Sequence, residues 1–194
     1  MSSRTEVSLT VPDAAAMRAL GTYLAKLLRA GDLVILSGGL GAGKTTLTQG
    51  IGAGLGVRGP VTSPTFVIAR VHPPVASADR AADLVAPRPP LVHADAYRLG
   101  SALELDDLDL DTDTAASVTV VEWGEGLAEG LAADRLEIVI TPETASGPDG
   151  SGSADLAASL DDAAADVPRT VRITAIGERW EGVQMPLANL VDRL

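Results

Sequence analysis

The sequence predicts a single α/β domain over residues 1–194, with a mainly parallel sheet and helices on both of its faces. Short apolar segments alternate along the chain with segments whose apolar residues recur at helical spacing, which is typical of this fold class. A glycine-rich loop joins one predicted strand directly to a predicted helix. Of the 194 residues, 46% are apolar, which is enough for one well-filled core but short for two.

Four elements are predicted in the first quarter of the chain. A strand at 6–11 is followed by Asp13, which is placed to cap a helix that stops by Gly31. Residues 32–38 form a short apolar run, as expected of a buried parallel strand. The glycine-rich loop follows, and a second helix is expected over 44–55.

The remaining elements alternate less regularly. Residues 59–71 are expected to form a turn that leads into a strand, and a separate strand is expected to end near residue 95. Further strands are expected at 117–123, 134–141 and 169–177. An acidic helix or loop is expected at 101–113 and a short helix at 124–131. The Pro- and Ala-rich segment 72–90 breaks every period, so we expect a surface excursion. Segment 142–168 is rich in Gly, Ser, Ala and Asp. Such a composition buries too little apolar area to offset the entropy of ordering, so we expect a flexible insertion.

Composition and charge exclude several classes of function. The chain has no cysteine, so disulfide frameworks, zinc knuckles and thiol chemistry are excluded. Its formal net charge is −11, with only two lysines, and such a chain has no global field to attract nucleic acid. Any RNA is therefore expected to be held by a partner. The start lacks the layout of a signal peptide and no apolar run has membrane-spanning length, so we expect a cytoplasmic protein with no membrane partner.

The loop at residues 38–45, GGLGAGKT, carries the strongest chemical signal. Gly38, Gly43, Lys44 and Thr45 satisfy the phosphate-binding pattern G-x-x-x-x-G-K-[ST]. Glycines let successive backbone N–H groups point at one anion, the lysine adds a charge toward the outer phosphates, and the threonine hydroxyl holds Mg²⁺. Because the loop lies between a predicted strand and a predicted helix, the sequence predicts a P-loop NTPase-like domain that binds ATP and Mg²⁺.

Two acidic residues stand where a second metal contact is needed. Asp95 follows the apolar run LVHA, and Glu122 follows VTVV. Because the carboxyl ends of parallel strands gather at one edge of a sheet, both side chains are expected to face the loop. Nucleotide hydrolysis needs a metal ion held from a second side and a positioned water, so we expect at least one acid to contact the metal or its waters. Considered alone, either acid could instead have a structural role, such as capping a helix, rather than contacting the metal.

Several other residues have two readings. Ser63 and Thr65 lie after the loop helix, where a switch segment would sense the γ-phosphate; the alternative is a Pro-containing turn. His93 is expected to share a strand face with the acid two residues later, either in catalysis or as a packed side chain. Arg98 either neutralises phosphate charge or pairs with a carboxylate, and Trp123 either packs or stacks on a base or partner.

Four ordered motifs resemble the bacterial TsaE (formerly YjeE) family. They are GGLGAGKTTL, TSPTF, HADAYRL and VVEW, and the set covers residues 6 to about 141. Members of this family are small ATPases needed for the threonylcarbamoyl modification of the adenosine next to the anticodon of tRNA. They dock on the TsaB–TsaD pair, in which TsaD performs the transfer, so the resemblance implies that this chain meets tRNA only through that complex.

The resemblance also implies roles for individual residues. The ATP phosphates would be wrapped by the loop and the start of its helix, namely Gly41, Ala42, Gly43, Lys44, Thr45 and Thr46, with Thr45 on Mg²⁺. Glu122 resembles the acidic Mg²⁺ ligand, and Asp95 the residue that arranges the catalytic water or the metal shell. The adenine would lie near Pro12, Asp13 and Ala14, with Arg135 as a weaker candidate for the base pocket.

This chain departs from the family at two points, and other functions remain open. The family usually has Asp where this chain has Gly39, and segments 72–90 and 142–168 are longer than typical. We expect weak ATPase activity in isolation, because no second cation that would complete the site is evident. One alternative is a small-molecule kinase, although the sequence shows no arginine-rich lid. The other is a nucleotide-gated scaffold that binds ATP without turnover.

Overall fold

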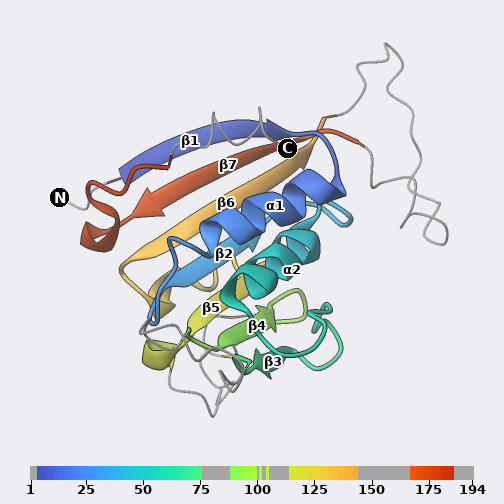
Figure 1. Cartoon of the computed structure of the whole chain (residues 1–194). Coiled ribbons are helices and arrows are strands. Elements are labelled where there is room, and N and C mark those ends of the chain that lie inside the picture. The colour runs from blue at the N-terminus through green and yellow to red at the C-terminus, as the bar shows by residue number, and fades with distance from the viewer. Residues whose placement is uncertain are drawn as a thin grey trace.

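A computed structural model describes residues 4–75, 88–99, 101, 104, 114–143 and 167–185 of the chain. Seven strands form one sheet in the order β1-β7-β6-β2-β5-β4-β3 (Figure 1). The strands are β1 (Arg4–Val11), β2 (Leu33–Ser37), β3 (Ala69–His72), β4 (Leu91–Asp95), β5 (Val118–Glu122), β6 (Arg135–Pro142) and β7 (Arg169–Ile176). The four central strands, β6, β2, β5 and β4, are parallel to one another, and the outer three pair antiparallel.

The central strands are apolar because both of their faces are covered. All five residues of β2, β4 and β5 are buried, as expected of parallel strands inside an α/β fold. Strands β1, β7 and the neighbouring β6 instead alternate between buried and more exposed residues, which is typical of strands with one face toward solvent. These observations confirm the α/β class and the parallel centre of the sheet.

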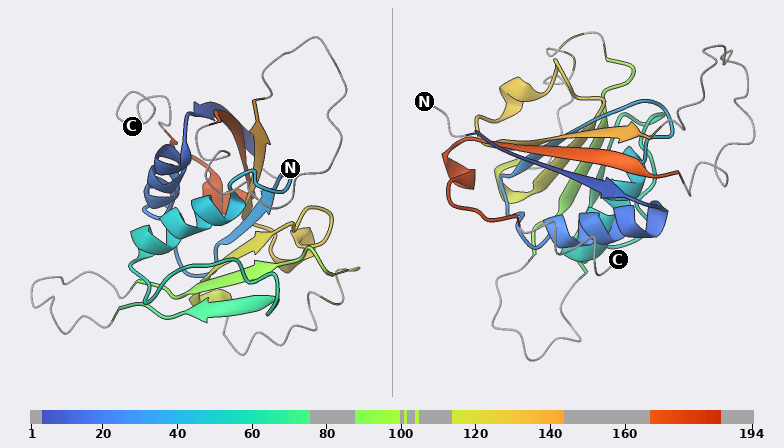
Figure 2. Two further views of the ribbon diagram at one scale, coloured as in Figure 1. Left: turned by 90° about the vertical axis from the view of Figure 1, so that its right-hand side faces the viewer. Right: turned by 90° about the horizontal axis from the view of Figure 1, so that it is seen from above.

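The two α-helices, α1 (Ala14–Leu24) and α2 (Lys44–Leu55), lie side by side on one face of the sheet (Figures 1 and 2). Asp13 caps α1 as predicted, because its carboxylate accepts a hydrogen bond from the Ala16 N–H at 2.8 Å. Helix α1 ends at Leu24, earlier than expected, because Lys26 N–H and Leu27 N–H bond to carbonyls only three residues back and tighten the chain into a turn. Helix α2 has the predicted bounds.

The opposite face of the sheet is covered differently from the prediction of helices on both faces. No described α-helix lies there. A second apolar cluster, which includes Ile35, Val121 and Ala128, is instead closed by residues 124–132, and these contain the short 3-10 helix η3 (Glu129–Leu131) (Figure 2). The start of this segment contains Gly124 and Gly126. Glycine disfavours the helical conformation, so a loop forms where a helix was expected.

Parts of three predicted segments lie outside the described residues. These are most of the excursion at 72–90, most of the acidic segment at 101–113, and the insertion at 142–168 apart from its ends. Two further 3-10 helices are η2 (Thr114–Ala116), which directly follows the acidic segment, and η4 (Glu178–Trp180), which follows β7. In the described part of the chain, no helix combines the length and apolarity that crossing a membrane requires.

Candidate functional site

The glycine-rich loop between β2 and α2 has the backbone that its sequence predicts. Gly43 has φ of 107°, a left-handed conformation at the N-cap of α2 that strongly favours glycine. A Cβ atom on Gly38 would lie 2.4 Å from the carbonyl oxygen of Ile140, so this position tolerates no side chain. The loop therefore passes close to β6 and delivers the free N–H groups of the first turn of α2 to one point, where the helix dipole favours an anion.

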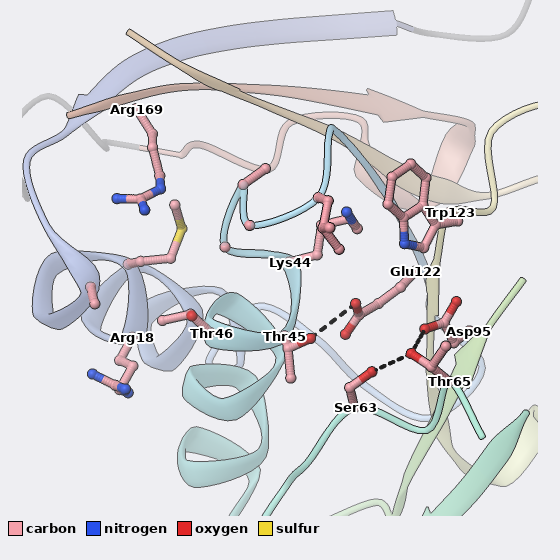
Figure 3. A pocket seen from close by; sticks show the side chains of 16 residues that line it. Arg18, Lys44, Thr45, Thr46, Ser63, Thr65, Asp95, Glu122, Trp123 and Arg169 are labelled. Atoms are coloured by element: carbon pink, nitrogen blue, oxygen red, sulfur yellow. Dashed lines mark hydrogen bonds between the residues drawn. The ribbon is translucent and has the colours of Figure 1, made fainter. Parts of the chain in front are cut away.

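A cavity of about 590 Å³ opens at this loop and lies at the carboxyl ends of the parallel strands (Figure 3). All six predicted residues of the loop and of the first turn of α2 line it, namely Gly41, Ala42, Gly43, Lys44, Thr45 and Thr46. Gly38 does not line the cavity, but its carbonyl oxygen accepts a hydrogen bond from Lys44 Nζ at 2.8 Å.

Lys44 is a buried cation at the centre of the cavity. Its ammonium group donates to the carbonyls of Gly38 and Gly39, the latter at 2.9 Å, and lies 3.6 Å from the centroid of the Trp123 ring. Burial lowers the pKa of Lys44, and the negative charges of Glu122 and Asp95 act in the opposite direction. The ammonium group is thus poorly hydrated and close to where an anionic ligand would lie.

Trp123 packs against residues of the site itself, and its stacking on a base or partner stays a prediction. It has φ of 59°, which is rare for a large side chain and marks local strain. That backbone carries the indole over Lys44, and its ring lies 5.1 Å from that of Tyr97. Trp123 lines the cavity, so its outer face is available to a ligand.

The two acids are brought together as expected. Asp95 and Glu122 are register partners at the ends of the parallel strands β4 and β5. Glu122 Oε2 accepts a hydrogen bond from Thr45 Oγ1 at 3.0 Å, which Figure 3 shows as a dashed line across the cavity. The other oxygen of Glu122, Oε1, lies 2.7 Å from His93 Nε2. Glu122 is therefore joined to the phosphate loop on one side and to β4 on the other.

Ser63 and Thr65 form a hydrogen-bonded chain that ends on Asp95. Their hydroxyl oxygens are 2.7 Å apart, and Thr65 Oγ1 donates to Asp95 Oδ2 at 2.5 Å (Figure 3). Asp95 Oδ1 also accepts from the Tyr97 backbone N–H at 2.9 Å, so the same carboxylate stabilises the turn after β4. Both hydroxyl residues line the cavity.

The side of the cavity away from the acids contains three residues that were not predicted from the sequence. Met17 and Arg18 come from α1 and Arg169 from the start of β7, while Ala14 of α1, which was predicted near the adenine, also lines the cavity. A Cβ atom on Gly43 would lie 3.6 Å from Arg169 Nε, so this buried guanidinium closely borders the loop. Arg18 and Arg169 are two cations at the cavity that were not predicted from the sequence, and the expectation of weak activity in isolation stays a prediction. Neither belongs to a local motif, so no signal in the sequence singled them out.

Besides Gly38, the predicted nucleotide-binding residues Asp13 and Arg135 do not line the cavity. Asp13 uses its carboxylate to cap α1, although the neighbouring Ala14 does line the cavity. Arg135 pairs in register with Leu33 at the opposite edge of the sheet, and its Nε bonds to Glu137 Oε1 at 2.8 Å. The structure therefore does not bring Arg135 to the other site residues.

The oxygen atoms at the site suit Mg²⁺ better than a metal that needs a full protein cage. The described residues contain no group of three or more His, Cys, Asp or Glu side chains that could hold a metal ion. Mg²⁺ usually keeps several waters and takes one or two protein oxygens plus phosphate oxygens. Thr45 Oγ1 and Glu122 Oε2, 3.0 Å apart beside the phosphate loop, meet that requirement.

Comparison with known proteins gives a consistent result. The family model "Threonylcarbamoyl adenosine biosynthesis protein TsaE" matches residues 11–148. The TsaE protein of Streptomyces coelicolor is 55% identical over 165 residues, covering 84% of this chain and 93% of the relative. That of Bacillus subtilis is 34% identical over 165 residues, covering 84% of this chain and 82% of the relative.

A solved structure agrees with the sequence relatives. The crystal structure of Bacillus subtilis YdiB superposes with a TM-score of 0.60 at 26% identity, covering 98% of this chain and 97% of that one. The fold is thus shared across nearly the full length of both chains. Together with the family match over most of the chain, this confirms the resemblance drawn from the four motifs: the chain belongs to the TsaE family of threonylcarbamoyl adenosine biosynthesis proteins.

Proposed function

We propose that this chain is the ATP-binding and ATP-hydrolysing subunit that supports threonylcarbamoyl modification of the adenosine next to the tRNA anticodon. Its relatives are named tRNA threonylcarbamoyladenosine biosynthesis proteins, which supports the role in this modification. The observation that carries the ATPase assignment is the hydrogen bond between Thr45 and Glu122 at 3.0 Å. It joins the phosphate loop to a strand acid at the point where a metal-bound triphosphate would lie.

Each residue of the cavity has a physical task in this proposal. The N–H groups of the loop and of the first turn of α2 bind the phosphate oxygens, and Arg169 and Arg18 add positive charge on the side of the nucleoside. Thr45 and Glu122 hold Mg²⁺, which when bound offsets charge on the outer phosphates. Asp95 orients the attacking water, and its own orientation is set by Thr65 and by the Tyr97 N–H.

Lys44 must exchange partners when ATP binds. Its ammonium group donates to two loop carbonyls, and a phosphate oxygen would replace at least one of them. Because a phosphate oxygen carries negative charge and a carbonyl oxygen does not, this exchange adds Coulombic attraction to the ammonium group and favours binding. It also frees at least one of the carbonyls of Gly38 and Gly39, so ligand binding is coupled to the shape of the loop.

The surface around the cavity supports partner docking, which we propose occurs on TsaB and TsaD. Leu40, Phe66 and Tyr97 are 90%, 84% and 63% exposed, and all three lie on or next to residues that line the cavity. Exposed apolar groups gathered at one place commonly mark a protein interface. A partner seated there would exclude water from the site, which is consistent with weak activity in isolation. The partner would also bind the tRNA, because this acidic chain is not suited to bind nucleic acid itself. We propose that this complex forms in the cytoplasm.

Reconstitution tests the proposal. The chain is mixed with TsaB, TsaD, the threonylcarbamoyl donor, ATP, Mg²⁺ and tRNA, and both modified tRNA and ADP are measured over many rounds. We expect repeated modification to require the chain and to produce ADP. Phosphorylation of a small molecule would identify a kinase instead, and intact ATP through many rounds of modification would identify a non-hydrolysing scaffold.

Two variants assign the acids in the same assay. Glu122→Ala is expected to retain part of its ATP binding but to lose Mg²⁺-dependent turnover. Asp95→Ala is expected to retain the Mg²⁺ requirement for binding and to lose turnover. Glu137→Ala removes a strand acid at the far edge of the sheet and serves as the matched control. Normal turnover in Glu122→Ala together with no turnover in Asp95→Ala would reverse the metal assignment.

A further inference from the structure

His93 is a buried side chain that the proposed mechanism does not use. It lies in the middle of β4, its side chain is 0% exposed, and it does not line the cavity. Its register partner on β5 is Val120, two residues before Glu122, so the two side chains project to the same face of the sheet. His93 Nε2 lies 2.7 Å from Glu122 Oε1, and the Glu122 side chain is only 3% exposed.

The surroundings of the imidazole indicate where its proton lies. An ionised carboxylate only accepts hydrogen bonds, so Nε2 carries the hydrogen that Glu122 Oε1 receives. Among the described residues, Nδ1 is buried and has no hydrogen-bond partner. A second N–H at that position would be buried without an acceptor, which is costly. The contact with Glu122 is therefore a hydrogen bond that His93 donates from Nε2.

This hydrogen bond leaves Glu122 with one carboxylate orientation. Oε1 is taken by His93, while Oε2 accepts from Thr45 Oγ1 at 3.0 Å. Rotation of the carboxylate would break both bonds inside the protein, where a lost bond is not replaced by water. Oε2 is thus held toward Thr45, on the side of the phosphate loop.

We propose that His93 is a positioning residue that fixes the Glu122 carboxylate so that Oε2 faces Thr45 and the Mg²⁺ they share. The proposal rests on the metal site put forward above. Residues that hydrogen-bond to metal ligands fix the orientation of those ligands, and their loss typically weakens metal affinity. A histidine that only filled space between β4 and β5 would have no such effect on metal binding.

The test measures the Mg²⁺ concentration that gives half-maximal ATP binding, with binding also measured in EDTA. For His93→Leu we expect this concentration to rise about 10- to 100-fold, with ATP binding in EDTA unchanged. For His93→Gln, whose amide nitrogen can occupy the place of Nε2, we expect a value near that of the unaltered protein. For His93→Asn, whose amide is too short to reach Glu122, we expect a rise like that of His93→Leu.

A buried histidine of the neighbouring strand provides the control. His72 on β3 is 3% exposed, its ring centroid lies 6.5 Å from that of His93, and it has no described contact with Glu122. His72→Leu should leave the Mg²⁺ requirement unchanged. If His93→Leu does not fold, the comparison of His93→Gln with His93→Asn decides the question, and equal Mg²⁺ requirements in these two variants overturn the proposal.

A second measurement needs neither ATP nor metal. In an NMR spectrum of the full chain with ¹⁵N-labelled histidine, we expect a slowly exchanging Nε2–H signal from His93 that Glu122→Ala removes. The absence of this signal overturns the hydrogen-bond assignment. If the signal is present but ATP binding by the unaltered protein does not depend on Mg²⁺, the proposed metal site fails while the His93 contact remains. If binding depends on Mg²⁺ but His93→Leu has the unaltered requirement, the positioning role fails alone.

Discussion

Helices α1 and α2 contact each other through their backbones at Gly50, and we predict that Gly50→Ala destabilises the protein. A Cβ atom on Gly50 would lie 2.1 Å from the carbonyl oxygen of Arg18 and 2.8 Å from its carbonyl carbon. These atoms belong to the backbone of α1, so no rotation of a side chain relieves the clash. Restoring even a 3.0 Å separation requires the helices to move apart by about 0.9 Å.

Two opposing effects set the size of the loss. Replacing glycine by alanine inside a helix stabilises it by about 1 kcal/mol. Overpacking a well-packed contact destabilises by about 1–3 kcal/mol, and a gap of about 0.5–1 Å removes a quarter to a half of the attraction between the separated atoms. Because the clash is between backbones, we take about 3 kcal/mol for the loss and expect a net destabilisation of about 2 kcal/mol. For a chain of this length that lowers Tm by about 4–8 °C.

Thermal unfolding followed by circular dichroism measures this effect. Gly130→Ala is the matched control, because a Cβ atom there would meet nothing within 4 Å, and we expect it to change stability by less than about 0.5 kcal/mol. ATP affinity should fall together with stability in Gly50→Ala, since α1 carries Arg18 and α2 carries Lys44, and both residues line the same cavity. A Tm equal to or above that of the unaltered protein would refute this account of the helix contact.

Three further predictions concern charge. Arg169→Ala should lower ATP affinity about tenfold or more in calorimetric titration, because a hydrogen bond to a charged group contributes about 1.5–3 kcal/mol; unchanged affinity would place this guanidinium outside the binding site. Burial lowers the pKa of Lys44 below its ordinary value of 10.5. Its ammonium charge is therefore lost as pH rises through that lowered pKa, and ATP affinity should fall over the same alkaline range. Titrations in a pH series should show this fall in the unaltered protein and not in Lys44→Arg. Burial also lowers the pKa of His72 below 6.5, so the unfolded chain takes up the proton first and stability should decrease as pH falls through 6.5. Urea unfolding at acid and neutral pH should show a smaller decrease in His72→Gln.

The parts of the site that lie next to each other in the chain could be predicted from sequence. Helix α2 has the predicted bounds, and Gly43 has the left-handed φ that the phosphate-binding pattern requires. Asp95 and Glu122 were placed together without knowledge of the strand order, because apolar runs in a parallel sheet end at the same edge. The prediction for the loop and α2 depends on residues that are adjacent in the chain. The prediction for the two acids depends on the way parallel strands are arranged in this fold class.

Partners across strands could not be predicted in the same way. His93 and Glu122 are 29 residues apart in the chain, and Thr65 and Asp95 are 30 apart. Whether two such side chains bond depends on the register of two strands and on the rotamers that packing allows. The sequence placed all four residues near one edge of the sheet, but it left open whether His93 was a packed side chain and whether Thr65 belonged to a plain turn.

The two arginines that begin β6 and β7 show how strand direction decides which side chain reaches the cavity. Arg135 was expected at the base pocket, whereas Arg169, which no sequence motif marked, lines the cavity. Strand β6 runs parallel to β2, so its first residue pairs with Leu33 at the edge opposite the loop. Strand β7 runs antiparallel to β6, so its first residue, Arg169, pairs with Pro142 at the edge that carries the loop. Strand direction alone thus exchanges the positions of two similar side chains. That direction is set by the connection between β6 and β7, whose composition carries no periodic signal.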